Sequence, residues 1–295
     1  MGPTLVTGGS GQVGQSLARL APDEVGLVFP TRAEMDLSDP AAIEAYVASR
    51  DWSAIISSGA YTAVDKAESD VAAAWAANAL GPAALAAASA KAGIPILHLS
   101  TDYVFDGSQP GFYRESDPVA PLGVYGASKE GGEQAVRTAN PKHIILRTAW
   151  VVSPFGNNFV KTMLRLGAER PQLRVVGDQY GCPTSALDIA STLLTILDHV
   201  SRDAAPPWGT YQFVNAGDTS WHGLACSALD RAATHGRSRP DIEAITTVDY
   251  PTPAKRPANS RLSTAKLEKA FGIQPRPWAA AINDIVDELL GEQTK

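Results

Sequence analysis

The chain opens with the stretch Pro3-Thr4-Leu5-Val6-Thr7-Gly8-Gly9-Ser10-Gly11-Gln12-Val13-Gly14, a short apolar run followed by a glycine-rich turn. The run predicts a buried strand, and the residues after the turn predict a helix. Glycines spaced Gly-x-x-Gly-x-x-Gly between these elements let a backbone approach a pyrophosphate held at a helix N-terminus. This context favours a dinucleotide site over a purely structural turn. The residues expected to bind the cofactor here are Gly8, Ser10, Gly11, Gln12 and Val13.

Four further apolar runs alternate with helical patterns in the first half of the chain. They are Val25–Phe29, Ala54–Ser57, Ile94–Leu99 and His143–Arg147. Short continuous apolar runs separated by helices are typical of a parallel sheet buried on both faces. The alanine-rich stretch from Ser69 to Ala92 is predicted as a crossover helix, because it ends at Gly93 just before a strand. We therefore expect an α/β fold with a Rossmann-like, doubly wound parallel sheet.

The alternation weakens after Trp150, where loops rich in proline and glycine appear. A helical run from Ser185 to Val200 and an apolar run from Tyr211 to Asn215 can rejoin the parallel sheet. The expected division is a dinucleotide-binding domain of residues 1–150, rejoined by residues 185–216, and a smaller, discontinuous C-terminal substrate lobe of residues 151–184 and 217–295.

Size and composition limit the class of protein. A chain of 295 residues with 44% hydrophobic content can bury a full core. The net charge of −6 argues against a broad nucleic-acid surface and favours small-molecule partners. Only Cys182 and Cys226 are present, without a Cys-x-x-Cys spacing, so we expect reduced thiols, no disulfide and no zinc site.

The N-terminal sequence and the length of the apolar runs indicate which cellular location to expect. The first strand starts at about Thr4, which leaves no room for a signal peptide. No apolar run is expected to reach the roughly 18 residues that a membrane span needs. We therefore expect a cytoplasmic protein without a membrane partner.

The residues after the second predicted strand bear on the choice of cofactor. An NAD-specific enzyme usually carries an acid there for the adenosine ribose, but the chain reads Phe29-Pro30-Thr31-Arg32-Ala33-Glu34. Arg32 can pair with a 2′-phosphate and Thr31 can donate to it, so we predict NADPH, with NADH as the alternative cofactor. Asp36 and Leu37 can bracket the adenine. A solvated surface charge is the alternative reading of Arg32, and a helix cap or surface acid that of Asp36.

The segment Tyr125-Gly126-Ala127-Ser128-Lys129 indicates the chemistry. Positions i and i+4 share one face of a helix, so the Lys129 ammonium can lie beneath the Tyr125 phenol and lower its pKa. Thr101 follows the strand predicted to end at Leu99, at the sheet edge where doubly wound folds bind ligands. This combination predicts hydride chemistry on a hydroxyl or carbonyl, with Tyr125 as general acid. Further cofactor contacts are expected after the third strand, from Ala60, Tyr61 and Thr62.

Segments spread over nearly the whole chain carry a resemblance to a known family. They are Gly8–Gly14, Ala60–Glu68, Ser100–Gly107, Tyr125–Lys129, Arg147–Val151, Asp178–Thr184 and Arg256–Ser260. The chain resembles the extended short-chain dehydrogenase/reductase superfamily and, within it, the dTDP-4-dehydrorhamnose reductases. The Tyr-x-x-x-Lys spacing alone indicates only the superfamily, whereas the whole set of segments is specific.

This resemblance implies an activity and the roles of three residues. Tyr125 is then the proton donor, Lys129 binds the nicotinamide ribose and tunes Tyr125, and Thr101 tunes the proton transfer. The implied reaction is NADPH-dependent reduction of dTDP-4-dehydrorhamnose to dTDP-L-rhamnose, the last step of dTDP-rhamnose biosynthesis.

The resemblance also implies which residues contact the nucleotide-sugar substrate. Thr101, Asp102, Tyr103, Trp150 and Val64 would line the sugar pocket, with Trp150 offering an aromatic face to the hexose. Packing at a domain junction is the alternative for Trp150, and core packing is the alternative for Val64. The loop that contains Lys255-Arg256 would face the nucleotide diphosphate, with a solvated basic pair as the alternative. The loop Asp178–Thr184 would shape the same cleft.

Related activities of the superfamily provide the alternatives. Dehydratases carry an Asp-Glu pair after the catalytic Thr, and Thr101-Asp102-Tyr103 lacks the Glu, which disfavours dehydration. A nucleotide-sugar 4-epimerase retains its NAD, whereas Arg32 suits an NADPH that is exchanged in each turnover. A non-catalytic regulatory subunit, resembling the methionine adenosyltransferase β subunit, is the other alternative. The complete set of Thr101, Tyr125, Lys129 and Trp150 favours an enzyme over it.

One departure from the family pattern concerns metal and oligomeric state. Some members dimerise through acidic side chains that share a magnesium ion, and one of these lies at the start of the first helix, where this chain carries Gln15. Mg2+ is therefore an alternative rather than an expected cofactor. We expect a monomer or a homodimer.

Overall fold

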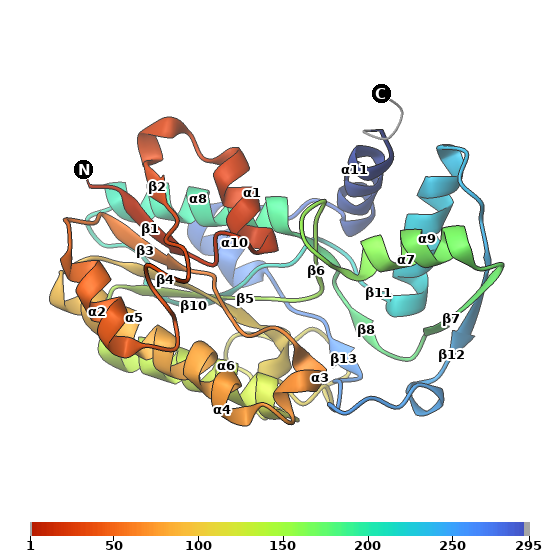
Figure 1. The fold of residues 1–295 in the computed structure, drawn as a ribbon, viewed down its shortest axis with the longest axis horizontal. Coiled ribbons are helices and arrows are strands. Elements are labelled where there is room, and N and C mark those ends of the chain that lie inside the picture. Colours follow the sequence, from red (N-terminus) through yellow and green to blue (C-terminus); the bar gives the residue numbers. More distant parts are fainter. Residues whose placement is uncertain (1, 292–295) are drawn as a thin grey trace.

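The computed structural model describes residues 2–291 and has a parallel six-stranded sheet at its centre (Figure 1). Its strands are β1 (Thr4–Thr7), β2 (Leu27–Val28), β3 (Ala54–Ser57), β4 (Ile96–Thr101), β5 (His143–Thr148) and β10 (Gly209–Gln212). They lie in the order β10-β5-β4-β3-β1-β2. The strand order reverses between β1 and β3, which makes the carboxyl ends of these two strands a topological switch point. The predicted doubly wound α/β fold is confirmed.

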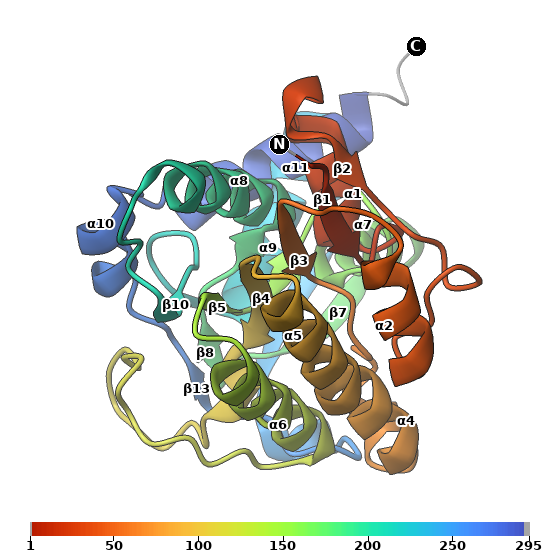
Figure 2. The same cartoon turned by 90° about the vertical axis from the view of Figure 1, so that its left-hand side faces the viewer.

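Helices cover both faces of this sheet (Figures 1 and 2). Successive strand residues point to opposite faces, so Val6 and Ile56 belong to one buried cluster and Leu5 and Ile55 to another. The first cluster includes side chains of α1 (Gln12–Leu20) and α8 (Ala186–Arg202), and the second includes side chains of α2 (Pro40–Ala48), α5 (Gly81–Lys91) and α6 (Val124–Ala139). Burial on both faces explains why the strands read as continuous apolar runs.

Several element boundaries differ from the predicted ones. The second strand is shorter than Val25–Phe29, because a 3₁₀ turn (Asp23–Val25) and Gly26, with φ of 59°, precede it. The fourth strand continues to Thr101, so Thr101 is its last residue rather than a residue beyond it. The predicted return of Tyr211–Asn215 to the sheet is confirmed as β10, which begins and ends earlier.

The alanine-rich stretch is helical but not regular. It forms α4 (Val71–Trp75), a π-helical turn (Ala76–Leu80) and α5, where one continuous helix was predicted. The whole stretch Val71–Lys91 is long and apolar enough to cross a membrane, so the expectation that no run reaches that length is wrong. It packs against α2, α6 and the sheet, as the core helix of a soluble protein does.

A smaller group of elements lies beside the sheet, on the right of Figure 1. Its main members are α7 (Phe159–Glu169), β7 (Gln172–Val176), α9 (Trp221–Thr234), β12 (Asp241–Ile245) and α11 (Trp278–Gly291). Strands β7 and β12 form a parallel pair. A buried apolar cluster of this part also contains Val104 and Phe105 from the first half of the chain. The division into two domains at the predicted residues stays a prediction.

Short elements complete the fold. They are α3 (Val64–Ala67), the 3₁₀ turns Asp102–Val104 and Thr247–Asp249, β6 (Val151–Val152), β8 (Tyr180–Gly181), β9 (Thr184–Ser185), β11 (Thr219–Ser220), β13 (Asn259–Ser260) and α10 (Ala265–Phe271).

The close packing of Gly14 against Gly8, in the glycine turn after β1, can be tested by substitution. A Cβ added at Gly14 would lie 2.2 Å from the carbonyl oxygen of Gly8. We expect Gly14→Ala to lower the free energy of unfolding by about 1–3 kcal/mol, because this contact outweighs the helix propensity of alanine. Urea denaturation measures the change, with Gly111→Ala as control because nothing lies within 4 Å of a Cβ there. Unchanged or increased stability of Gly14→Ala would contradict this packing.

Candidate active site

A cavity of about 620 Å³ lies at the switch point of the sheet. It is formed by the loops after β1, β3, β4 and β5 and by the first turns of α6, and we call it the active-site cavity. Among the predicted residues, those that line it are Gly8, Ser10, Gly11, Gln12, Val13, Ala60, Thr62, Val64, Thr101, Asp102, Tyr103, Tyr125, Lys129 and Trp150. The fold therefore brings the predicted catalytic residues and most of the predicted binding residues into one cavity.

The glycine turn has the geometry that a pyrophosphate needs. Gly8 adopts a φ of +75°, and the Gly11 amide donates to the Gly8 carbonyl at 2.9 Å. Cβ atoms at Gly8 and Gly14 would lie 2.6 Å from Gly59 Cα and 2.2 Å from Gly8 O, so only glycine fits at either position. Helix α1 starts after Gly11 without a side-chain cap, and its first amides are available to an anion. These observations fit a dinucleotide cofactor.

Gln12 has a structural contact that the motif does not reveal. Its Nε2 donates to the Val151 carbonyl at 3.2 Å, and its Oε1 accepts from Ser153 Oγ at 2.8 Å and from Asn158 Nδ2 at 3.1 Å. The side chain therefore ties the first residue of α1 to the segment that leads into α7. The cofactor turn and the far wall of the cavity are held together by one residue.

Tyr125 lies in the first turn of α6 and Thr101 lies at the end of β4. Burial raises the pKa of the Tyr125 phenol to about 12. A hydrogen bond with Thr101 partly offsets this rise. The Lys129 ammonium donates to the Leu99 carbonyl at 2.7 Å. The predicted effect of Lys129 on the pKa of Tyr125 stays a prediction. A phenol with a raised pKa holds its proton at neutral pH, as a general acid must.

A buried ion pair between Glu133 and Arg147 influences the charge state of Lys129. Burial lowers the pKa of the ammonium to about 8, and the Glu133 carboxylate opposes this shift. Glu133 accepts from Arg147 Nε at 2.8 Å and from Arg147 Nη2 at 2.7 Å, and it also pairs with Arg137. Its side chain is 0% exposed and that of Arg147 is 3% exposed. Lys129 therefore has a backbone carbonyl as hydrogen-bond partner and an anchored carboxylate that favours its charged form.

Asp102 and Tyr103 lie directly after Thr101 in the cavity wall. Asp102 Oδ1 accepts from Thr101 Oγ1 at 2.9 Å, while its buried Oδ2 has no partner of good hydrogen-bond geometry. Burial raises the pKa of the Asp102 carboxyl to about 6, although the hydroxyls of Ser260 and Thr101 lower it in part. The Tyr103 ring meets the Tyr125 ring edge to face, with centroids 5.4 Å apart.

Trp150 lines the cavity, and its ring packs between two neighbours. Its ring stacks on Trp221 with centroids 3.6 Å apart and planes 10° apart. A Cβ added at Gly181 would lie 2.4 Å from Trp150 Cε2 and 2.7 Å and 2.8 Å from the two atoms beside it, which places Gly181 above the opposite face. Trp150 also has a positive φ of 48°, unlike the other non-glycine residues within 2–291. This packing fits the alternative interpretation of Trp150, at a domain junction, and its contact with the hexose stays a prediction.

Four predicted cofactor residues do not line the cavity. The Tyr61 amide donates to Asn78 Oδ1 at 2.8 Å and its hydroxyl donates to Asp70. Arg32 has a side chain that is 85% exposed and pairs with Asp36 at 2.9 Å. Hydrogen bonds from Ser38, with Arg32, lower the pKa of Asp36 to about 2. Leu37 packs beside Gly59, and the roles of all four in cofactor binding stay predictions.

Asn78 is a residue that sequence reasoning missed. Its side chain accepts from the Tyr61 amide, donates to the Tyr61 carbonyl at 3.1 Å and donates to Ser128 Oγ at 3.0 Å. It therefore ties the loop after β3 to the catalytic helix, from within the π-helical turn. A polar residue inside an otherwise apolar helix was the available signal.

Within residues 2–291, neither clusters of metal-ligating side chains nor a pair of bonded cysteines is found. Groups of three or more His, Cys, Asp or Glu that could hold a metal do not occur within residues 2–291. Gln15 donates to the Ser10 carbonyl at 2.8 Å on the outside of the glycine turn. Cys182 is buried, Cys226 is partly exposed, and both are free thiols.

The chain is similar to one known family over nearly its whole length. The family model of the RmlD substrate binding domain matches residues 2–290. A dTDP-4-dehydrorhamnose reductase of Aggregatibacter actinomycetemcomitans is 44% identical over 292 residues, which cover 97% of this chain and 98% of that protein. The chain belongs to the dTDP-4-dehydrorhamnose reductase family. This membership confirms the resemblance inferred from the motifs.

Solved structures of this family agree with the fold. A dTDP-4-dehydrorhamnose reductase ortholog of Clostridium acetobutylicum has a TM-score of 0.91 at 35% identity, covering 97% of this chain and 99% of that one. A dTDP-4-dehydrorhamnose reductase of Bacillus anthracis, solved in complex with NADP, has a TM-score of 0.91 at 32% identity, covering 98% and 100%.

The buried carboxyl of Asp102 gives a test of the site's electrostatics. Because its pKa is raised from 3.8 to about 6, the protonated form is favoured by folding, and this contribution is lost as pH rises through about 6. We expect Asp102→Asn to stabilise the protein by at most about 3 kcal/mol at pH 8 and by little at pH 4. Denaturant unfolding at both pH values measures this difference. An effect that is equal at the two pH values would contradict a charged, buried Asp102.

Proposed function

We propose that the protein reduces dTDP-4-dehydrorhamnose to dTDP-L-rhamnose with NADPH as hydride donor. The observation that carries this proposal is the convergence of Tyr125, Thr101 and Lys129 with the glycine turn in one cavity. Membership in the reductase family and the NADP complex of the Bacillus anthracis relative support the substrate and the cofactor.

The residues of the cavity divide the reaction between them. NADPH, when bound, supplies the hydride that C4 of the hexulose receives. Tyr125 donates its phenolic proton to O4 as negative charge develops there, and the hydroxyl of Thr101 stabilises the phenolate that remains. Lys129 provides an ammonium beside the same centre for the ribose of the cofactor. Because these interactions strengthen only as charge develops, they act on turnover more than on binding.

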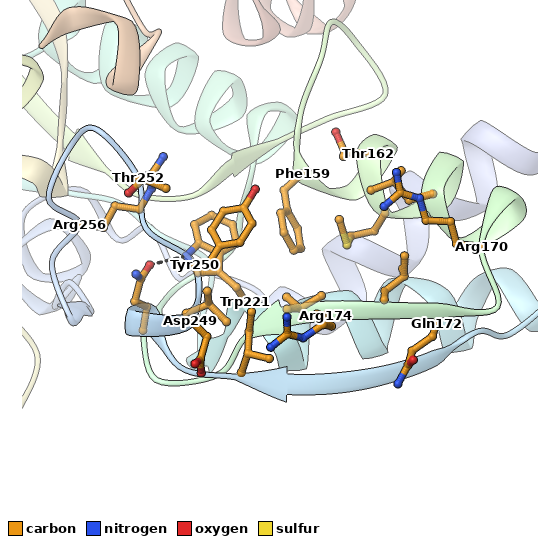
Figure 3. Close-up of a pocket in the computed structure, with 17 residues that line it drawn as sticks. Phe159, Thr162, Arg170, Gln172, Arg174, Trp221, Asp249, Tyr250, Thr252 and Arg256 are labelled. Atoms are coloured by element: carbon orange, nitrogen blue, oxygen red, sulfur yellow. Dashed lines mark hydrogen bonds between the residues drawn. The ribbon is translucent and has the colours of Figure 1, made fainter.

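A second cavity can receive the nucleotide end of the substrate. It has a volume of about 710 Å³ and combines aromatic side chains of Phe159, Trp221 and Tyr250 with the cations of Arg170, Arg174 and Arg256 (Figure 3). We call it the nucleotide cavity. It adjoins the active-site cavity, because Trp221 stacks on Trp150. Aromatic faces suit a pyrimidine base and guanidinium groups suit phosphates.

The two alternative activities are less well supported. A regulatory subunit would not need a buried acid, a buried ammonium and a phosphate-binding turn in one cavity. A 4-epimerase would return its hydride to the substrate, and the relatives described above are reductases. A cytoplasmic location, a monomeric or homodimeric state and any role of Mg2+ stay predictions.

Tyr125→Phe tests the proton donor. The variant keeps the ring but removes the acid, so we expect turnover to fall by roughly 10²–10⁴-fold while NADPH binding is unchanged. NADPH oxidation with the dTDP-4-keto sugar measures the first quantity, and titration of NADPH fluorescence measures the second. Tyr46→Phe, on α2, serves as the control. Turnover within tenfold of the unmodified protein would exclude Tyr125 as the acid.

Arg32→Ala tests the cofactor preference. Loss of a charged hydrogen bond to the 2′-phosphate should raise the KM for NADPH about tenfold or more and leave the KM for NADH unchanged. Steady-state kinetics with both cofactors measures this. Arg202→Ala is a matched control, because Arg202 is also exposed and paired with an aspartate. An unchanged KM for NADPH would remove Arg32 from the cofactor site.

A further inference from the structure

An ion pair joins the short helix after the cofactor loop to the loop that precedes β13. Asp65, on α3, accepts from Arg256 Nη1 at 3.1 Å and from Arg256 Nη2 at 2.7 Å. The Ala254 amide also donates to Asp65, at 3.2 Å. The Arg256 side chain is 23% exposed and that of Asp65 is 41% exposed. This carboxylate therefore holds both the guanidinium and the backbone of the loop.

The pair lies at the junction between the two cavities. Arg256 lines the nucleotide cavity, at the end opposite Arg170 in Figure 3. Val64, the neighbour of Asp65, lines the active-site cavity. Tyr103 also lines that cavity; burial raises the pKa of its phenol, and the charge of Arg256 opposes this rise. A ligand with one end in each cavity must therefore pass close to the guanidinium.

The geometry of the pair leaves part of Arg256 available. Asp65 occupies the end of the guanidinium, where Nη1 and Nη2 form a fork. Within the described residues, Nε of Arg256 has no hydrogen-bond partner. The edge formed by Nε and the second hydrogen of Nη2 can therefore bind a phosphate with two parallel hydrogen bonds while Asp65 remains in place.

We propose that Asp65 is a positioning residue that orients Arg256 so that its Nε edge binds the diphosphate of the substrate at the junction of the two cavities. This inference rests on the proposed function. A long arginine side chain loses rotamer freedom when it binds a ligand, and a carboxylate that already restrains it reduces that loss. The same carboxylate also repels the diphosphate. If removal of the Asp65 carboxylate weakens binding of the diphosphate, its orientation of Arg256 is the larger effect. If removal strengthens binding, its repulsion of the diphosphate is the larger effect.

The test uses two ligands that differ only in the diphosphate. Calorimetric titration of dTDP and of thymidine is carried out with the unmodified protein, with Asp65→Asn, with Asp65→Glu and with Asp230→Asn. Asp230 also pairs with an arginine but lies on α9, outside both cavities. We expect Asp65→Asn to weaken dTDP binding about tenfold, as the loss of one charge-assisted contact does. Thymidine affinity and NADPH affinity should not change, Asp65→Glu should recover part of the loss, and Asp230→Asn should have no effect.

Kinetics provide a readout that a merely structural role would not move. In Asp65→Asn the KM for the dTDP-4-keto sugar should rise about tenfold while kcat changes by less than about threefold. Unchanged or tighter dTDP binding in Asp65→Asn overturns the proposal, and so does an equal loss for thymidine. If the unmodified protein binds dTDP but does not reduce the keto sugar, the proposed function fails while the dTDP titrations still decide the role of Asp65. If it does not bind dTDP, both fail.

Discussion

The buried ion pair between Glu133 and Arg147 fixes the catalytic helix against the sheet. Glu133 lies one turn after Lys129 and two turns after Tyr125 on α6, and Arg147 lies near the end of β5. Both side chains are almost fully buried and meet through two parallel hydrogen bonds. Removal of one partner from such a pair costs about 3–5 kcal/mol, because the other charge remains buried. The rotation of α6, and with it the position of the phenol, depends on this contact.

The cavity is closed by side chains that link distant segments around this helix. Gln12 ties the cofactor turn to the segment after β6, Asn78 ties the loop after β3 to α6, and Asp65 ties α3 to the loop before β13. Each contact joins residues at least 50 positions apart in sequence. The site is consequently preorganised by polar contacts at its rim, whereas the two apolar clusters stabilise the sheet beneath it.

The sequence predicted those features of the fold and the site that depend on local residue patterns. The glycine spacing, the Tyr125/Lys129 spacing and the apolar runs identified the turn, the catalytic helix and the parallel sheet, because each signal lies within a few residues. Contacts between distant residues were not predictable in this way. Trp150 packs between Trp221 and Gly181, and Lys129 donates to the Leu99 carbonyl. The π-helical turn was not predicted, because an alanine-rich stretch gives no local signal that distinguishes it from a regular α-helix.

Transfer of deuterium tests the central claim most directly. NADPH deuterated at C4 of its nicotinamide ring, on the transferred side, is incubated with the protein and the dTDP-4-keto sugar, and the product is analysed by NMR and mass spectrometry. Net reduction with Tyr125 as acid predicts deuterium at C4 of the sugar and one oxidised cofactor for each product formed. A product without deuterium at C4, or a changed sugar with the cofactor left reduced, would contradict the account.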